Sequence, residues 1–197
     1  MRNIILFLSV FTLVFILGGC TKCNDTKPQG DNLPQVNMDN LKNNESDTTV
    51  FGTCVDATSN TVSILTDNGD TVQYVCADVY TEDGTPSGSV IRGGKFVGDR
   101  MAIVGRIGAE ENLADCIVNL TSLLGHWTSL DRDFEILDGG EVKSSIEAES
   151  NPYTAWHIFN GKLILSKDTF EICELGPDSL LLENDKGIYG YKRKLSD

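Results

Sequence analysis

Apolar and polar residues alternate along most of the chain beyond residue 48, with the two-residue period typical of half-buried β-strands. Clusters of Gly, Asn, Asp and Pro divide this alternation into short runs, as turns between neighbouring strands do. No run with the period of an amphipathic helix interrupts the last third of the chain. The pattern therefore predicts an all-β protein.

Residues 48–121 are predicted to contain five short strands. These are residues 50–56, 61–66, 71–75, the run that follows a turn within 96–105, and 116–120. Asn68-Gly69 separates the second run from the third and favours a tight hairpin, because both residues tolerate positive φ. Residues 81–94 are expected to form a looser connection, and residues 109–114 could add a helical turn.

These five strands resemble a small OB-like or SH3-like barrel, and we interpret residues 48–121 as one small β-barrel. OB barrels often bind oligosaccharides or single-stranded nucleic acid. Binding of single strands uses basic grooves with aromatic side chains, and no basic stripe with interleaved aromatic residues is visible here. We therefore expect this barrel to act as a spacer rather than as a ligand groove.

Residues 122–197 are predicted to contain eight strands joined by short turns. The strands are residues 124–130, 134–137, 141–148, 153–159, 162–166, 169–175, 179–183 and 188–195. Turn residues lie between them, including Asn160-Gly161 and Gly176-Pro177-Asp178. This order predicts an up-and-down meander that closes into a barrel.

The second barrel resembles the lipocalin-like domains of bacterial envelope lipoproteins, because Gly125-x-Trp127 matches the motif of the first lipocalin strand. In that family an Arg of the last strand covers the Trp at the closed end of the barrel. The matching residue is Arg193, which shares strand parity with Tyr189 and Tyr191 and so faces the interior. The resemblance implies a structural role in barrel closure for Gly125, Trp127 and Arg193. The unit is shorter than a full lipocalin and lacks the C-terminal helix.

Bulky side chains are expected to fill the interior of this barrel. The inward candidates are Trp127, Phe134, Ile136, Val142, Ile146, Trp156, Ile158, Phe170, Ile172, Leu180 and Leu182. Because an eight-stranded barrel is just wide enough for side chains or one small ligand, a deep fatty-acid pocket is not expected. Binding is instead expected at the open rim or at the seam between the two units. Each unit is small enough to be marginal alone, so we expect the two to pack together.

The first nineteen residues have the features of an export signal, with Arg2 before an apolar run at 4–16. The following Leu17-Gly18-Gly19-Cys20 resembles the lipobox of bacterial lipoproteins, which implies cleavage before Cys20 and acylation of that residue. The alternative is an uncleaved anchor helix. Thr21, rather than Asp, follows the cysteine, which by resemblance favours the outer membrane. Residues 20–47 are then a lipidated, polar tether with too few apolar residues to fold alone.

The formal net charge of −13 argues against nucleic acid as a partner, because phosphate contacts need clustered Lys and Arg. Acidity is most simply explained by solubility, and it could also favour a basic protein or cations. The expected partners are the lipid bilayer, through acylated Cys20, and a small hydrophobic ligand, a glycan or another envelope protein.

Candidate chemical groups are few. Cys54, Cys76, Cys116 and Cys173 are expected to be buried small hydrophobic residues or to include one disulfide, and the sequence leaves these alternatives open. His126 and His157 each neighbour an inward Trp and are therefore expected to face solvent, without a partner at metal-ligand spacing.

No catalytic motif is present, and acidic residues near turns, such as Asp131, Asp133, Glu147 and Glu149, are expected to be solvated. We therefore expect no catalysis, no cofactor and no metal. The favoured function is a membrane-anchored, non-catalytic binding or accessory lipoprotein of the cell envelope. The alternative is an inhibitor or stress-sensing lipoprotein, since an acidic lipid-anchored barrel resembles bacterial lysozyme inhibitors. Envelope copper-stress lipoproteins are also similar, but they place the barrel first and carry a CxxC pair that the folded part here lacks.

Overall fold

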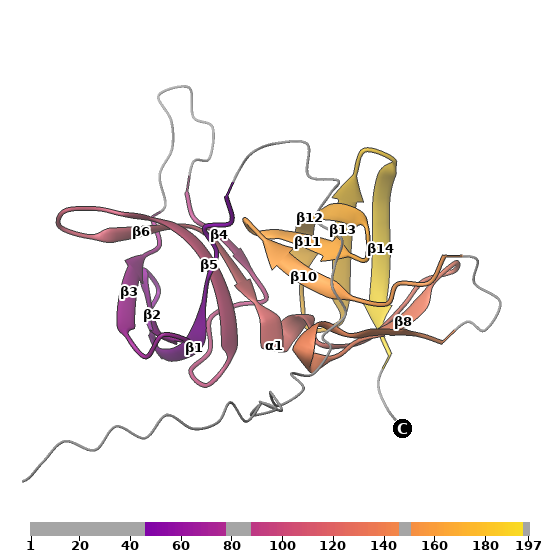
Figure 1. Ribbon diagram of the computed structural model, residues 1–197, viewed down its shortest axis with the longest axis horizontal. Coiled ribbons are helices and arrows are strands. Elements are labelled where there is room, and N and C mark those ends of the chain that lie inside the picture. Colours follow the sequence, from indigo (N-terminus) through magenta and orange to yellow (C-terminus); the bar gives the residue numbers. More distant parts are fainter. Residues whose placement is uncertain (1–45, 78–87, 146–150, 195–197) are drawn as a thin grey trace, which may run out of the picture. The chain divides into compact units, whose positions relative to one another are not determined.

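The computed structural model describes residues 46–77, 88–145 and 151–194, and Figure 1 shows that these residues form two successive β-barrels. All of them belong to one compact unit. They contain fourteen strands, one single-turn helix, α1 (Leu120–Leu123), and a 3₁₀ turn at Asp138–Gly140. The prediction of an all-β chain with a small barrel followed by an up-and-down barrel is confirmed.

The first barrel is closed by five strands. These are β1 (Val50–Ala57), β2 (Thr61–Thr66), β3 (Thr71–Val75), β5 (Arg100–Ile107) and β6 (Asn112–Asn119). Their order is β3-β2-β1-β5-β6, and a parallel pairing of Val75 with Leu113 joins β3 to β6. A meander of three strands that closes through one parallel pair is the strand order of an OB barrel. The Asn68-Gly69 hairpin between β2 and β3 is present, with Gly69 at φ 90°.

Two details of the first barrel differ from the prediction. A three-residue strand, β4 (Val90–Arg92), lies in the stretch expected to be loose and pairs in parallel with β6. The possible helical turn at 109–114 is wrong, because β6 begins at Asn112 and the turn before it is closed by Gly108 N donating to Glu111 O at 3.1 Å. The backbone of β6 pairs with strands on both sides, and this pairing outweighs the local preference of the segment.

The second barrel contains eight antiparallel strands in the predicted positions. They are β7 (Gly125–Thr128), β8 (Asp133–Ile136), β9 (Val142–Ser144), β10 (Trp156–Phe159), β11 (Lys162–Leu165), β12 (Asp168–Leu175), β13 (Ser179–Asn184) and β14 (Gly187–Arg193). Consecutive strands are neighbours, and β14 pairs with β7. Between β9 and β10 the contact is a single bridge from Glu141 to Ala155, so the barrel is nearly closed.

The interior of the second barrel is filled with side chains. Ten of the eleven predicted inward residues are buried: Trp127, Phe134, Ile136, Val142, Trp156, Ile158, Phe170, Ile172, Leu180 and Leu182. Ile146, the eleventh, lies outside the described residues. A lumen occupied in this way has no room for a long apolar ligand along the barrel axis.

The two barrels share apolar packing. Ala102 and Val118 of the first barrel, with Leu120 and Leu123 of α1, belong to the same buried cluster as the core of the second barrel. The remaining core of the first barrel forms a separate cluster around Val62, Ile64 and other buried residues. The small size of each unit predicted this mutual packing.

The outer face of the β10–β11 hairpin is also covered. Phe159 and Ile164 lie on the outward side of their strands by register, yet they are only 7% and 4% exposed. The rings of Phe51 in β1 and His157 in β10 lie 6.3 Å apart, which places the start of the first barrel near this face. Apolar residues on both faces of the hairpin are therefore explained by burial on both sides.

Candidate functional site

Trp127 and Arg193 meet at the end of the second barrel where β7 begins. The Trp127 side chain is fully buried, and its Nε1 donates to Leu123 O at 2.9 Å. The guanidinium carbon of Arg193 lies 4.1 Å from the centroid of the indole, in cation–π geometry. Trp127 lies in β7 and Arg193 in β14, so this contact joins the first and the last strand of the barrel.

The guanidinium also binds three backbone carbonyls. Arg193 Nη1 donates to Leu124 O at 2.7 Å, Nη2 to Ser122 O at 2.6 Å, and Nε to Pro177 O at 2.5 Å. Burial lowers the pKa of Arg193. An arginine guanidinium nevertheless stays charged at physiological pH. All three partners are main-chain groups of the chain itself, next to or within the second barrel.

Gly125 leaves space for this arrangement. Its φ is 124°, a conformation that side chains rarely adopt, and a Cβ at this position would collide with Nη1 of Arg193. The three residues that the sequence assigned to barrel closure are therefore brought into direct contact.

A pocket of about 410 Å³ opens at the other end of the second barrel, where β7 ends. We call it the rim pocket. It is lined by Ser129, Leu130, Asp131, Arg132, Tyr153, Asp168, Phe170, Asn184, Lys186, Ile188, Tyr189, Gly190 and Tyr191. These residues come from the β7–β8 and β13–β14 turns and from the adjacent ends of β12, β13 and β14, together with Tyr153 before β10.

Aromatic side chains form the base of the rim pocket. Phe170 packs edge-to-face against Tyr189, with centroids 5.7 Å apart, and against Tyr153 at 6.4 Å. Phe134 lies below and contacts Tyr153 and Tyr191 in the same geometry, at 5.4 and 5.1 Å. Burial raises the pKa of Tyr153 and of Tyr191, so both phenols are neutral at physiological pH. Tyr189 is the one lining tyrosine that is only half-buried.

Charged side chains surround this aromatic base. The guanidinium carbon of Arg132 lies 4.6 Å from the centroid of Tyr153, and Nη1 donates to Asn151 O at 2.9 Å. Lys186 Nζ pairs with Asp168 at 3.0 Å, and this hydrogen bond raises the pKa of Lys186. Ser129 N donates to Arg132 O at 2.7 Å, which closes the β7–β8 turn and fixes the position of this part of the rim.

Binding was expected at the open rim or at the seam between the two units, but the sequence named no residues for such a site. The parity of Tyr189 and Tyr191 placed them inside the barrel, but ligand-binding residues were not predicted.

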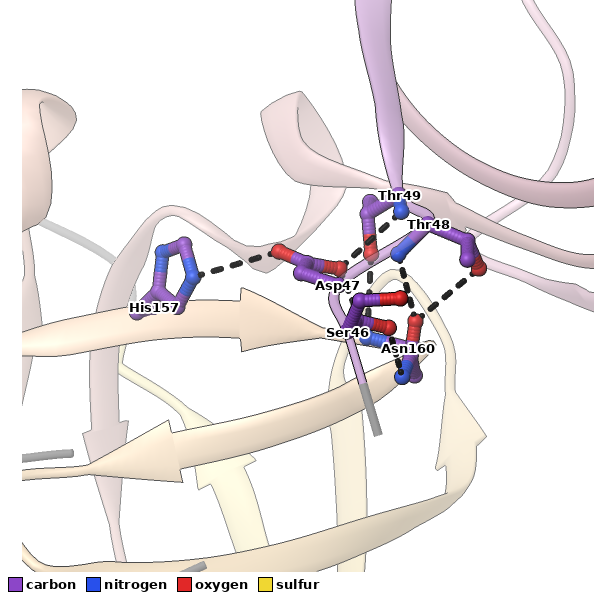
Figure 2. Close-up of polar contacts among 6 residues, drawn as sticks. All are labelled: Ser46, Asp47, Thr48, Thr49, His157 and Asn160. Carbon is purple, nitrogen blue, oxygen red and sulfur yellow. Dashed lines mark hydrogen bonds and ion pairs between the residues drawn. The ribbon is translucent and has the colours of Figure 1, made fainter. Parts of the chain in front are cut away.

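A second polar cluster joins the two barrels at the β10–β11 turn, and Figure 2 shows it. Asn160 Oδ1 accepts from the backbone N of Thr48 at 2.9 Å and from its hydroxyl at 3.0 Å. Asn160 N donates to the Thr49 hydroxyl at 2.9 Å, and Asn160 Nδ2 donates to Ser46 O at 3.2 Å. Asp47 lies between Thr49 and His157, whose Nε2 is 3.7 Å from the carboxylate. Residues 46–49 are therefore fastened to the second barrel.

His126, Asp133 and Ser145 lie together and include the residue types of a nucleophilic triad. Both Asp133 and Ser145 contact the same ring nitrogen, Nε2 of His126. A triad needs the carboxylate on one imidazole nitrogen and the hydroxyl on the other, so this geometry cannot relay a proton between them. The hydrogen bond from His126 lowers the pKa of Asp133, which also lies 3.5 Å from Lys194 Nζ. The cluster is a hydrogen-bond network on the surface, with the Lys194 ammonium beside the Asp133 carboxylate.

The two histidines are less exposed than the sequence predicted. Their side chains lie on the outward side of β7 and β10, but they are 26% and 37% exposed because each has an aspartate neighbour. Strand parity correctly placed them outside the lumen and could not predict these partners.

The four described cysteines, Cys54, Cys76, Cys116 and Cys173, are free thiols. Burial raises the pKa of Cys54 and of Cys116, which makes both poor nucleophiles. The structure thus favours the interpretation of Cys54 and Cys76 as small buried hydrophobic residues. Cys20, Glu147 and Glu149 lie outside the described residues.

Within residues 46–77, 88–145 and 151–194, no group of three or more His, Cys, Asp or Glu side chains is arranged to hold a metal ion. None of the helices in these ranges has the length and apolar character needed to cross a membrane. No protein family, no curated protein and no solved structure matches the chain.

Proposed function

We propose that this protein is a lipid-anchored, non-catalytic binding protein of the bacterial cell envelope, and that the rim pocket is its binding site. The observation that carries this proposal is the rim pocket itself, an open concavity of about 410 Å³ with an aromatic base and a few polar groups. Small-molecule sites have this composition, and they often lie in the mouths of β-barrels.

The closed end supports the assignment of the second barrel as lipocalin-like. Eight meandering strands, Gly125, Trp127 and an Arg193 guanidinium over the indole reproduce the combination that the sequence resemblance implied. Because the closed end is sealed and the lumen is filled, ligand access is confined to the rim.

Acylated Cys20 anchors the proposed protein to the outer membrane through the lipobox at residues 17–20. Two or more acyl chains make such attachment stable, since each buried methylene contributes about 0.8 kcal/mol. Replacing Cys20 with Ala tests this part of the proposal. We expect the chain to move from the membrane fraction to the soluble fraction, and unchanged acylation and fractionation would contradict it.

The binding role is tested with the ¹⁵N-labelled mature chain carrying Cys20→Ser, to which fractions of envelope extract are added. We expect amide shifts concentrated at residues 129–132 and 184–191, which line the rim pocket. Shifts confined to the first barrel, or no shifts with any fraction, would contradict the rim as the binding site.

A second candidate function is inhibition of a basic enzyme such as lysozyme. It is favoured by the β7–β8 turn, where Leu130 is fully exposed beside the exposed carboxylate of Asp131. A protruding apolar and acidic tip suits a basic active-site cleft. Inhibition near one-to-one stoichiometry, weakened by Leu130→Ser, is the expected result. Full lysozyme activity at a large excess of the protein removes this candidate.

A further inference from the structure

We propose that the rim pocket binds a neutral saccharide. This inference rests on the proposed function, because it names the ligand class of the same pocket. Three properties of the pocket lead to it: its depth, its aromatic surface and its charge balance.

The rim pocket is too shallow for an acyl chain. Phe134, Phe170 and Tyr191 lie at its base and are only 1%, 2% and 3% exposed, so the barrel is filled beneath them. A long apolar ligand needs a continuous apolar channel to bury its surface. The ring contacts of Phe134 with Tyr191 and of Phe170 with Tyr189 close that route. The ligand must therefore lie across the rim with part of its surface in water.

Tyr189 provides the accessible aromatic surface. It is half-buried, and its edge-to-face contact with Phe170, at an interplanar angle of 90°, holds the ring in one orientation. The face of an aromatic ring is negative. The C–H groups on one side of a sugar ring carry partial positive charge, so a sugar stacks on such a face without needing a charge of its own.

The charges of the pocket lining balance. Asp131 and Asp168 supply two negative charges, and Arg132 and Lys186 supply two positive charges. Lys186 Nζ already pairs with Asp168 at 3.0 Å, and the guanidinium of Arg132 lies over Tyr153. A ligand with net charge would meet no excess of the opposite sign, which disfavours phosphates and polyamines.

Hydroxyl groups suit this lining better than any single charged group. Each hydroxyl both donates and accepts. The carboxylates of Asp131 and Asp168 accept, Lys186 donates, and the side chain of Asn184 does both. A saccharide can use donors and acceptors placed around one aromatic face, whereas a fatty acid or a phosphate would leave most of them without ligand partners.

The test is an NMR titration of the full mature chain carrying Cys20→Ser. The neutral probes are chitotetraose, cellotetraose and maltotetraose, and the other arms are palmitate and inorganic phosphate. We expect at least one neutral tetrasaccharide to shift the amides of residues 129–132 and 184–191 in a saturable way. Tyr189→Ala should weaken its affinity about tenfold, as expected for the loss of a stacked ring and its buried area. Phe96→Ala is the matched control, because Phe96 is also an exposed aromatic residue, 62% exposed, on the first barrel. It should leave the affinity unchanged.

The arms separate this inference from the proposed function. If palmitate or phosphate shifts the rim amides and no tetrasaccharide does, the inference of a saccharide ligand is wrong. The rim pocket then remains a binding site. If a tetrasaccharide binds but Tyr189→Ala and Phe96→Ala change its affinity equally, the sugar does not stack on Tyr189 and the inferred mode of binding is wrong. If no probe shifts the rim amides, the saccharide inference is overturned, and the envelope-extract titration decides the proposed function separately.

Discussion

Removal of the Arg193 guanidinium should destabilise the second barrel more than most surface changes would. Arg193→Ala deletes the cation–π contact with Trp127 and three hydrogen bonds, to Ser122 O, Leu124 O and Pro177 O. Hydrogen bonds to charged groups contribute about 1.5 to 3 kcal/mol each, and a cation–π contact about 0.5 to 2 kcal/mol. Because Arg193 is only partly buried, water replaces part of this loss, and we expect a destabilisation of about 3 to 5 kcal/mol.

The assay is urea unfolding of the mature chain carrying Cys20→Ser, with the unfolding monitored by Trp fluorescence. Arg193→Lys keeps the charge but cannot reach three carbonyls at once, so it should lose about half as much stability as Arg193→Ala. Lys192→Ala is the matched control, since Lys192 is an exposed neighbour on the opposite face of β14, and it should change stability by less than about 0.5 kcal/mol.

A small loss of stability in Arg193→Ala would refute this reasoning. If the free energy of unfolding of Arg193→Ala lies within about 1 kcal/mol of that of the parent chain, water satisfies the three carbonyls and the guanidinium does not close the barrel. Equal losses for Arg193→Lys and Arg193→Ala would assign the effect to the shape of the guanidinium rather than to its charge.

Four further predictions follow from the structure. Gly125→Ala should lower the melting temperature by several degrees, because the new Cβ meets the arginine guanidinium at a positive φ, and differential scanning calorimetry measures this. Asn160→Gly should cost about 1 to 2 kcal/mol through the lost side-chain hydrogen bonds to residues 46–49. Asn160→Ala should cost about 1 kcal/mol more, because the φ of 46° is unfavourable for Ala, and equal losses in urea unfolding would contradict this. Asp133 has a pKa lowered below its unfolded value of 3.8, so its contribution to stability is complete above that pH and is lost as pH falls through the lower folded value. Asp133→Asn should therefore make the decline in stability below about pH 4 less steep. Residues 122–197 expressed alone should unfold without full cooperativity, because the shared apolar cluster is cut, and a stable cooperative fragment in calorimetry would contradict this.

Local signals made the second barrel predictable. Asn160-Gly161 lies between β10 and β11 with φ of 46° and 79°, which is the hairpin chemistry that Asn-Gly indicated. Strand parity likewise gave the inward set, since a period of two fixes which side chains share a face. Arg193 and Trp127 were paired from parity and resemblance, and they lie in contact across the β14–β7 pair.

Features that depend on residues far away in the sequence could not be predicted from local sequence patterns. β4 has only three residues and exists as a strand because β6 pairs with it, and the first residues of β6 are extended because β5 and β3 flank them. The Asn160 cluster joins residues more than 110 positions apart, so no local pattern announces it. The rim pocket is similar, because its lining comes from turns that meet only when the barrel closes.

The sequence by itself determined the strand order of the second barrel, the inward set and the residues of the closed end, because alternation and turn chemistry act over a few neighbouring residues. Only the tertiary structure decided how the first barrel closes, how residues 46–49 are fastened to Asn160, and where an open pocket remains. Those features depend on which distant segments satisfy one another's hydrogen bonds and fill one another's volume, and such pairing is a property of the whole packed chain.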